Sequence, residues 1–266
     1  MFPLRQKGLK IGFVPTMGAL HNGHLSLINI ARQQCDVVVC SIFVNPTQFN
    51  DPRDLEKYPR PIAADIKKLE QVKADILFEP AVTEMYADNE HWHLQIGDLE
   101  HLLEGASRPG HYQGVTQVVN KLFNIVKPDV AFFGQKDYQQ FLVINKMVEL
   151  LQLPVKLVMC PIEREPDGLA MSSRNIHLTP DDRMHALVLS RALNQAKASF
   201  TAGEDIITIQ QNASALINAE PGTRLEYFEL ANGETLLPAK PNNASIVALV
   251  AARVGNTRLI DNVIIR

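Results

Sequence analysis

Residues 11–28 read Ile-Gly-Phe-Val-Pro-Thr-Met-Gly-Ala-Leu-His-Asn-Gly-His-Leu-Ser-Leu-Ile, and the fold can be worked out from this stretch. The apolar run Ile11–Val14 predicts a buried strand that Pro15 ends. Gly18 suits a turn in which a Cβ would obstruct the backbone or a ligand. Apolar residues then recur at helical spacing over 25–34. A helix that follows a strand in this way presents the N–H groups of its first turn beyond the strand's carboxyl end, where an anion can bind.

His21 and His24 lie on one side of that first helical turn, since they are three residues apart. Asn22 is the expected N-cap, and Gly23 opens the helix. A lone histidine near a helix start is more commonly a capping or surface residue. Two of them behind Gly18 favour a phosphate site instead, because a phosphate there would meet both backbone donors and two imidazoles.

The composition is that of an ordinary globular chain. Its 266 residues are 46% hydrophobic and 21% charged, enough for one large domain or for one medium and one small domain. The net charge of -3 argues against a protein whose main partner is nucleic acid. Cys35, Cys40 and Cys160 all stand beside apolar residues, which predicts buried thiols in a reducing compartment. No signal segment or membrane-spanning run is expected, so the prediction is a cytoplasmic protein without a membrane partner.

Apolar runs alternate with amphipathic segments through the first half of the chain. The expected strands are Ile11–Val14, Val37–Val44, Ile76–Phe78, Val130–Phe133 and Val155–Met159. The expected helices are Leu25–Gln34, Ile62–Val72, Val115–Val126 and Gln139–Leu151. This alternation predicts an α/β fold, a Rossmann-like parallel sheet with helices on both faces. In such sheets, residues just after the strands carry the chemistry.

A smaller C-terminal α+β domain is expected after a stretch rich in turn residues, Pro161–Asn175. Thr179 and Pro180 restart a helix there as cap and first helical residue. Two helices, about 181–201 and 205–219, precede strands near 225–230 and 246–254. The predicted domains are therefore 1–162, which would carry the main ligand site, and 163–266, which would act as a lid.

Polar residues follow two of the expected strands. An Asn-Pro turn after the second strand explains Asn45 but not Gln48. After a later strand, Gly134 is followed by Lys136 and Asp137. A Lys-Asp pair at a helix start is commonly solvated, but a glycine directly after an apolar run favours a turn that faces a ligand. Lys136 would offer a cation to phosphate oxygens, and Asp137 could accept from ribose or ring groups or help to hold a metal.

Two further segments contain possible phosphate ligands. Ser172 and Ser173 offer hydroxyl donors, and Arg174 offers a planar cationic fork. A Ser-Ser-Arg sequence in a loop is more commonly a helix cap with a solvated charge. Arg108 lies in the glycine-rich stretch 105–114, which is expected to be a loop. It is either a solvent-exposed arginine or a lid residue that closes over bound nucleotide.

The string Pro15–His24 is similar to the signature of the pantoate–β-alanine ligase family. Its His-Asn-Gly-His core resembles the His-x-Gly-His motif of the wider nucleotidylyltransferase superfamily, which includes class I aminoacyl-tRNA synthetases. Met171–Arg174 resembles the second phosphate-binding loop of that superfamily. The resemblance covers most of the chain and is tightest in the N-terminal two-thirds.

The resemblance implies an ATP-dependent ligase that condenses (R)-pantoate with β-alanine to pantothenate. The intermediate would be pantoyl adenylate, and AMP and pyrophosphate would be released. Mg²⁺ would bridge phosphate oxygens of ATP. The implied partners are these small-molecule substrates, and a homodimer is expected from the family.

By the same resemblance, the residues with catalytic roles are His24, His21, Lys136 and Arg174. The ATP-binding residues are Met17, Gly18, Ala19, Leu20, His21, Asn22, Gly23, His24, Gly134, Gln135, Lys136, Asp137, Glu163, Met171, Ser172, Ser173 and Arg174. The substrate-binding residues are Gln48, Gln140, Asn45 and Arg108. A neutral amide such as that of Gln48 binds hydroxyl groups without pairing with the carboxylate that must attack. Residues that hold the metal are not assigned.

The chain departs from the family at Glu163, where valine is common. A backbone contact with ATP would tolerate this change, whereas apolar packing on adenine would not. Two other functions compete with the ligase. One is transfer of a nucleotidyl group to a phosphorylated acceptor, which would call for more arginines than the Asn45–Phe49 string offers. The other is a nucleotide-binding regulator without catalysis, which would not need every phosphate contact.

Overall fold

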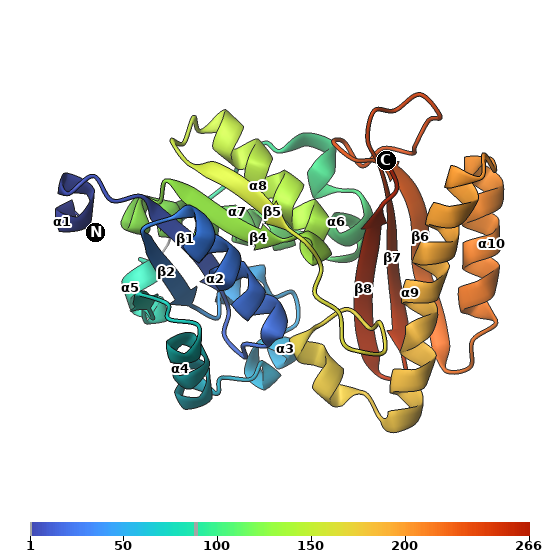
Figure 1. Ribbon diagram of the computed structural model, residues 1–266, viewed down its shortest axis with the longest axis horizontal. Coiled ribbons are helices and arrows are strands. Elements are labelled where there is room, and N and C mark those ends of the chain that lie inside the picture. The colour runs from blue at the N-terminus through green and yellow to red at the C-terminus, as the bar shows by residue number, and fades with distance from the viewer. Residues whose placement is uncertain (1, 88–89) are drawn as a thin grey trace. The chain divides into compact units, whose positions relative to one another are not determined.

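In a computed structural model that describes residues 2–87 and 90–266, the chain forms two compact units (Figure 1). The N-terminal unit comprises Met1–Gln135 and Gln139–Pro161. The C-terminal unit comprises Lys136–Tyr138 and Ile162–Arg266. The nucleotide-binding and lid functions expected of these two parts stay predictions.

The N-terminal unit is built on a parallel sheet with strand order β3-β2-β1-β4-β5. Its strands are β1 (Ile11–Thr16), β2 (Val37–Ile42), β3 (Ile76–Phe78), β4 (Val130–Gly134) and β5 (Lys156–Cys160). Every strand is short and nearly every residue of the central strands is buried, as both-sided cover requires. The predicted α/β class is confirmed.

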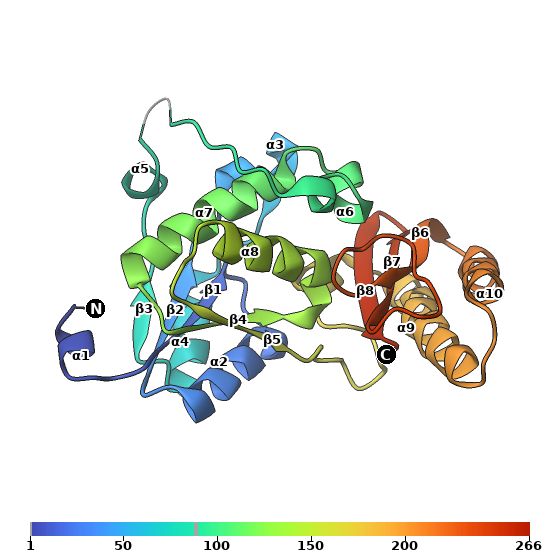
Figure 2. The same cartoon turned by 90° about the horizontal axis from the view of Figure 1, so that it is seen from above.

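Helices cover both faces of this sheet. Figure 2 shows α2 (Asn22–Gln34) and α4 (Ile62–Gln71) on one face, and α7 (His111–Val126) and α8 (Tyr138–Leu150) on the other. The alternation of side chains along the strands builds the two cores. Shorter helices are α1 (Phe2–Gln6), α3 (Pro52–Lys57), α5 (Val82–Met85) and α6 (Leu103–Ser107). Short 3₁₀ turns are Pro46–Gln48, Gly97–Glu100, Gln135–Asp137 and Ser173–His177.

The two faces have different packing partners. Phe132 and Cys40 point toward α2, where Ile28 is fully buried. On the other face, the rings of Phe13 and Phe133 meet that of Phe123 from α7 edge-on, with centroid distances of 6.3 and 6.4 Å.

The chain reverses its course across the sheet between β1 and β4. After β1 the chain builds β2 and β3 on one side, and it then returns to build β4 and β5 on the other. In the register of β1 and β4, only Gly12 pairs with Val130 and Phe13 with Ala131. The carboxyl ends of these two strands are therefore not paired with each other. Ligands of open α/β sheets bind at such a switch point.

Three local expectations are wrong. β1 continues through Pro15 to Thr16, because the proline lies beyond the register in which β1 pairs with β4 and its missing N–H breaks no bond there. The N-cap of α2 is His21 rather than Asn22, which is the first helical residue. The stretch 105–114 is mostly helical, with α6 and α7 leaving only residues 108–110 between them.

The C-terminal unit is a small α+β fold. Its antiparallel sheet has the order β6-β7-β8, with β6 (Thr223–Asn232), β7 (Ile246–Val254) and β8 (Thr257–Ile264). Helices α9 (Pro180–Thr201) and α10 (Ile206–Asn218) pack side by side on it. The predicted cap is confirmed, since the Thr179 side chain accepts from the N–H of Asp182. The sequence patterns indicated β6 and β7 but not β8.

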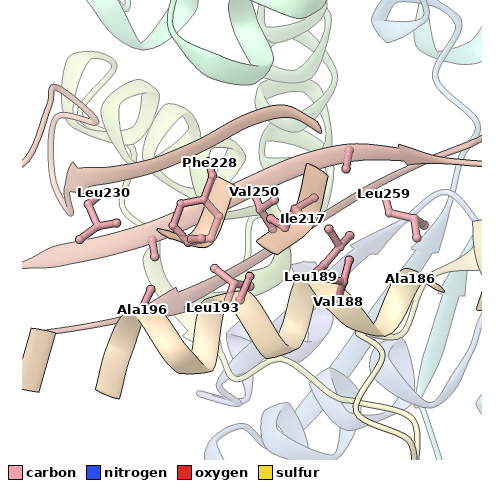
Figure 3. Close-up of a cluster of buried hydrophobic side chains, with 14 of the residues drawn as sticks. Ala186, Val188, Leu189, Leu193, Ala196, Ile217, Phe228, Leu230, Val250 and Leu259 are labelled. Atoms are coloured by element: carbon pink, nitrogen blue, oxygen red, sulfur yellow. The ribbon is translucent and has the colours of Figure 1, made fainter. Parts of the chain in front are cut away.

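One apolar core holds this unit together. Figure 3 shows Leu189 and Leu193 of α9 against Phe228, Val250 and Leu259 of the sheet. Burial of a leucine- or phenylalanine-sized side chain contributes about 1.5–3 kcal/mol. The packed α9 therefore gives the sheet a stable base, and β8 runs along it from Thr257 to Ile264.

Candidate active site

The first turn of α2 brings the two predicted histidines together. The ring centroids of His21 and His24 are 4.1 Å apart. The backbone N–H of His21 donates to Nδ1 of His24 at 3.3 Å. Since Nδ1 is the acceptor, the proton of a neutral His24 lies on Nε2, at the far side of the ring. His24 is thereby held as a hydrogen-bond donor.

The loop before α2 is held by a buried carboxylate that the sequence patterns did not indicate. Asp65 of α4 is fully buried and accepts from the N–H groups of Ala19 at 2.7 Å and Leu20 at 2.9 Å. The ammonium of Lys68, one turn later, donates to the carbonyl of Leu20. Helix α4 therefore binds two backbone N–H groups and one backbone carbonyl of the loop.

Gly18 is required at its position for two reasons. Its φ of +80° lies in the left-handed region, and an added Cβ would stand 3.0 Å from Ile42 and 3.2 Å from the Asp65 carboxylate. Its N–H donates to the Thr16 hydroxyl at 3.1 Å. The expected need for glycine in this turn is confirmed.

These bonds determine which backbone donors remain for a ligand. The N–H groups of Gly18, Ala19 and Leu20 are engaged within the protein. Asn22 and Gly23 are the first helical residues of α2, where the helix offers no carbonyl partner to their N–H groups. The helix dipole adds positive potential at the same place. The turn can therefore bind an anion through two backbone donors and the neighbouring imidazoles.

The turn after β2 is built around the side chain of Asn45, which is 1% exposed. Its Nδ2 donates to Oε1 of Gln48 and to the carbonyl of Gly114, both at 3.1 Å. Its Oδ1 accepts from the Tyr86 hydroxyl at 2.7 Å and from Thr47. Burial raises the pKa of Tyr86, so this hydroxyl stays a proton donor at neutral pH. Asn45 thus fixes the orientation of the Gln48 amide.

Gln48 is held from three sides. Its side-chain Nε2 lies 3.2 Å from the sulfur of Met17, in the loop before α2. The backbone carbonyl of Gln48 lies 2.8 Å from Nδ1 of His111, and Nε2 of His111 is 3.1 Å from the guanidinium of Arg108. Because a guanidinium only donates, His111 accepts through Nε2 and donates through Nδ1. Arg108 is half-buried and joined to the turn that carries Gln48, in contrast to the solvent-exposed alternative.

The residues after β4 begin α8. Gly134 ends β4, and an added Cβ would find no atom within 4 Å. Gln135 belongs to the following 3₁₀ turn, and Gln140 lies half-buried in the first turn of α8. Beside it, the buried Gln139 bonds to the carbonyls of Leu99 and Leu102, which fixes α8 to the segment before α6.

In the C-terminal unit, Lys136 and Ser172 line the same small pocket, although they are far apart in the sequence. Its other lining residues are Leu169, Ala170, Leu189, Leu259, Ile260 and Asp261. The structure therefore brings together one residue from each of the two predicted phosphate-binding segments. Asp137 beside Lys136 is exposed.

The second predicted phosphate loop starts from a hairpin-like segment. Arg164 and Ala170 form an antiparallel bridge, and the N–H of Met171 donates to the carbonyl of Glu163 at 2.9 Å. The side chain of Glu163 itself is exposed. Ser172 caps the next turn by accepting from the N–H of Arg174.

Ser173 begins that turn and is half-buried, while Arg174 is exposed to solvent. Sequence reasoning missed the residues that hold these segments in place, which are Asp65, Lys68, Tyr86, His111, Arg164, Asp261 and Asn262. The buried polar pair Asp261-Asn262 within an apolar strand was the clearest available signal.

Within residues 2–87 and 90–266, no three acidic, histidine or cysteine side chains gather closely enough to hold a metal ion. Over the same residues, no helix has both the length and the apolarity to cross a membrane. Cys40 and Cys160 are buried free thiols, and Cys35 is a half-buried one.

Comparisons with known proteins place the chain in one family. The family model described as Pantoate-beta-alanine ligase matches residues 2–264. The pantothenate synthetase of Moorella thermoacetica is 50% identical over 262 residues, which cover 98% of this chain and 93% of that protein. That of Thermotoga petrophila is 48% identical over 263 residues, covering 98% and 94%.

Solved structures are similar over nearly the whole chain. The pantothenate synthetase of Thermus thermophilus matches with a TM-score of 0.93 at 44% identity, covering 96% of this chain and 93% of that one. The pantoate-β-alanine ligase of Francisella tularensis, described as complexed with βγ ATP and β-alanine, matches with a TM-score of 0.80 at 39% identity, covering 97% and 90%.

A parallel sheet with a histidine-bearing helix start at its switch point defines an α/β protein of the kind that binds ligands beyond the strand ends, and the similar proteins above identify it as a ligase. Within that class, the chain belongs to the pantoate–β-alanine ligase family. The resemblance inferred from its motifs is confirmed.

Proposed function

We propose that this chain condenses (R)-pantoate with β-alanine in two steps. The pantoate carboxylate attacks the α-phosphorus of ATP, which forms pantoyl adenylate and releases pyrophosphate. The β-alanine amine then attacks the acyl carbon, which forms pantothenate and releases AMP. The family membership supports the overall ATP-dependent condensation. The single observation that supports the adenylation step is the donor set at the first turn of α2.

In this reaction the protein mainly positions phosphates and offsets the charge that develops on them. We assign His21 and His24 to that task at the start of α2, and Lys136 and Arg174 to the triphosphate. The fixed tautomer of His24 suits the role, because Nε2–H donates without a prior proton transfer. The remaining nucleotide contacts are proposed for Met17, Gly18, Ala19, Leu20, Asn22, Gly23, Gly134, Gln135, Asp137, Glu163, Met171, Ser172 and Ser173.

Gln48, Gln140, Asn45 and Arg108 are proposed to serve pantoate. The support differs among them. Gln48 is nearly buried and its amide is oriented by Asn45, as a group that must recognise hydroxyls needs to be. Arg108 acts on the same turn through His111, so its role is to hold Gln48 as well as to meet substrate.

Mg²⁺ is proposed to enter with ATP as part of the substrate. The described residues offer no cluster of ligands for a resident ion, and Mg²⁺ is commonly held by phosphates and water with few protein ligands. We also propose a cytoplasmic homodimer. The free cysteines support a reducing compartment, and sedimentation would measure the oligomeric state.

The products of ATP decide between this reaction and its alternatives. With ATP, Mg²⁺, pantoate and β-alanine, the protein should release AMP and pyrophosphate in equal amounts with pantothenate. Omission of β-alanine should leave pantoate-dependent exchange of pyrophosphate into ATP. Formation of ADP, or exchange that needs no pantoate, would reject the proposed reaction.

Replacement of Gln48 tests the pantoate assignment. Gln48→Ala should raise KM for pantoate by about tenfold or more, as loss of an oriented hydrogen bond from a buried amide does, and should leave KM for ATP nearly unchanged. Gln95→Ala, at an exposed glutamine, is the matched control. A change confined to ATP would show that Gln48 belongs to the nucleotide site instead.

A further inference from the structure

Strand β8 contains two adjacent polar residues that are almost completely buried. Asp261 is 5% exposed and Asn262 is 2% exposed. Polar groups in such positions destabilise the fold unless partners satisfy them. Asn262 has a partner at Lys136, and Asp261 has one at Arg164, in the segment that leads to the Ser172–Arg174 loop.

Asn262 holds the segment that follows β4. Its Nδ2 donates to the backbone carbonyl of Lys136 at 2.9 Å. Nearby, the hydroxyl of Tyr138 donates to the carbonyl of Gly233 at 2.9 Å. These bonds explain why Lys136–Tyr138 belong to the C-terminal unit although the strand before them belongs to the N-terminal one.

Asp261 holds the segment that leads to the second phosphate loop. Its two carboxylate oxygens accept from the guanidinium of Arg164 at 2.7 and 3.1 Å, in a bidentate pair. Arg164 also donates to the carbonyl of Gly168 and bridges to Ala170, at the two sides of the hairpin-like segment. Met171 and Ser172 follow directly, so the position of this loop depends on the ion pair.

The two residues of β8 are themselves linked. The N–H of Asn262 donates to Oδ1 of Asp261 at 2.8 Å, so a shift of one changes the other. Lys136, Ser172 and Asp261 also line one pocket. Asp261 and Asn262 therefore lie beside the pocket where the Lys136 segment and the loop with Ser172 meet.

We propose that Asp261 and Asn262 are positioning residues that set the Lys136 segment and the Ser172–Arg174 loop in register for one triphosphate. They act through backbone carbonyls and through Arg164, without contact with the reacting atoms. The inference rests on the proposed function, since it takes Lys136 and Arg174 as ligands of ATP. It adds that strand β8, which is far along the chain from either segment, affects kcat/KM for ATP.

The charge balance of the pocket gives a distinguishing prediction. The Asp261 carboxylate would repel a triphosphate if it were not neutralised by Arg164. Arg164→Gln leaves that charge uncompensated, whereas Asp261→Asn removes it. Arg164→Gln should therefore raise KM for ATP more than Asp261→Asn does, and the double variant should recover part of the loss.

The first test uses the full chain and pantoate-dependent pyrophosphate exchange. Asn262→Asp keeps the side-chain shape but replaces the donor to the Lys136 carbonyl by an oxygen. It should lower kcat/KM for ATP by about ten- to hundredfold and change KM for pantoate less than about twofold. Asn218→Asp, at an exposed asparagine of the same unit, is the matched control. Kinetics of Asn262→Asp equal to those of the control would overturn the proposal, as would equal losses for ATP and pantoate.

Two further measurements keep the outcome decisive. Thermal unfolding reports whether each variant is folded. If Asn262→Asp does not fold, KM for ATP of Arg164→Gln tests the proposal instead, because the Arg164 side chain is only half-buried. Unchanged KM for ATP in folded Arg164→Gln would overturn the proposal. Titration of each variant with ATP alone, read by heat release, gives the same comparison without catalysis. If wild-type protein binds ATP but shows no exchange, the proposed function fails while the positioning role is still measured.

Discussion

At the scale of single residues, His24 shows how a backbone contact prepares a side chain for chemistry. The hydrogen bond from the His21 N–H occupies Nδ1, and this leaves the protonated Nε2 as the donor. A histidine without that bond would populate both tautomers. The helix start can therefore offer donors to an anion and also selects the form of the imidazole that can donate to it.

Replacement of His24 should affect catalysis far more than folding. His24→Ala should slow pyrophosphate exchange by about 10²–10³-fold, the usual cost of a lost donor to developing charge. The free energy of unfolding should change by no more than about 1 kcal/mol, since the side chain is only half-buried. His101→Ala, at an exposed histidine, is the control. Normal exchange by His24→Ala would remove His24 from the mechanism.

The buried thiols should resist alkylation in the native protein. Burial raises the pKa of Cys40 to about 12 and that of Cys160 to about 11, so hardly any reactive thiolate forms at about pH 8. Iodoacetamide followed by mass spectrometry should find both unmodified until denaturant is added. Labelling of Cys40 at the same rate with and without denaturant would contradict its burial.

At the scale of elements, the sequence patterns predicted the parallel strands and the long helices, because both-sided burial gives continuous apolar runs. They failed for β8, where Arg258, Asp261 and Asn262 interrupt the apolar pattern. Asp261 and Asn262 are also the residues to which we assign the positioning role, so the polar pair that hid the strand is the same pair that holds the Lys136 and Arg164 segments. Sequence spacing likewise could not show that Asp65, two segments away, holds the loop before α2.

The contact of α7 with the turn after β2 leaves no room for a side chain at Gly114. An added Cβ would stand 2.4 Å from the Thr47 carbonyl oxygen and 2.7 Å from the Gln48 nitrogen. Gly114→Ala should push that turn away, destabilise the protein by about 1–3 kcal/mol and raise KM for pantoate. Urea unfolding and steady-state kinetics measure the two effects.

Asn124→Ala, at an exposed position of the same helix, controls for a change in α7 itself. If Gly114→Ala loses stability but keeps its KM for pantoate, the turn that carries Gln48 does not serve that substrate. If neither quantity changes, the close approach of α7 is wrong.

At the scale of the whole molecule, ion pairs make the stability depend on pH. Glu220 accepts from His185 at 2.8 Å and from Arg191 at 2.6 Å. The bond from His185, and then the charge of Arg191, lower the pKa of the Glu220 carboxyl. Its ionised form therefore stabilises the folded protein above the ordinary carboxyl pKa, and this stability is lost as the pH falls through the lowered pKa.

Glu220→Gln should reduce the free energy of unfolding at about pH 7 by about 0.5–1 kcal/mol, the scale of a solvent-screened pair. The difference from wild type should shrink as the pH falls through the lowered pKa of Glu220, because below it the carboxyl is protonated in both folded and unfolded protein. Urea unfolding over this pH range measures it. A difference that grows toward acid would have the wrong sign and would contradict the lowered pKa.

The assignment of Lys136–Tyr138 to the C-terminal unit has a practical consequence for anyone who wishes to cut the protein in two. The polypeptide passes between the units after Gln135, after Tyr138 and after Pro161. A fragment that stops at Pro161 would retain three residues whose packing partners are missing, and the complementary fragment would lack them. Neither fragment therefore contains a complete unit. A mixture of the two can restore activity only if residues 136–138 of the N-terminal fragment pack against the C-terminal fragment.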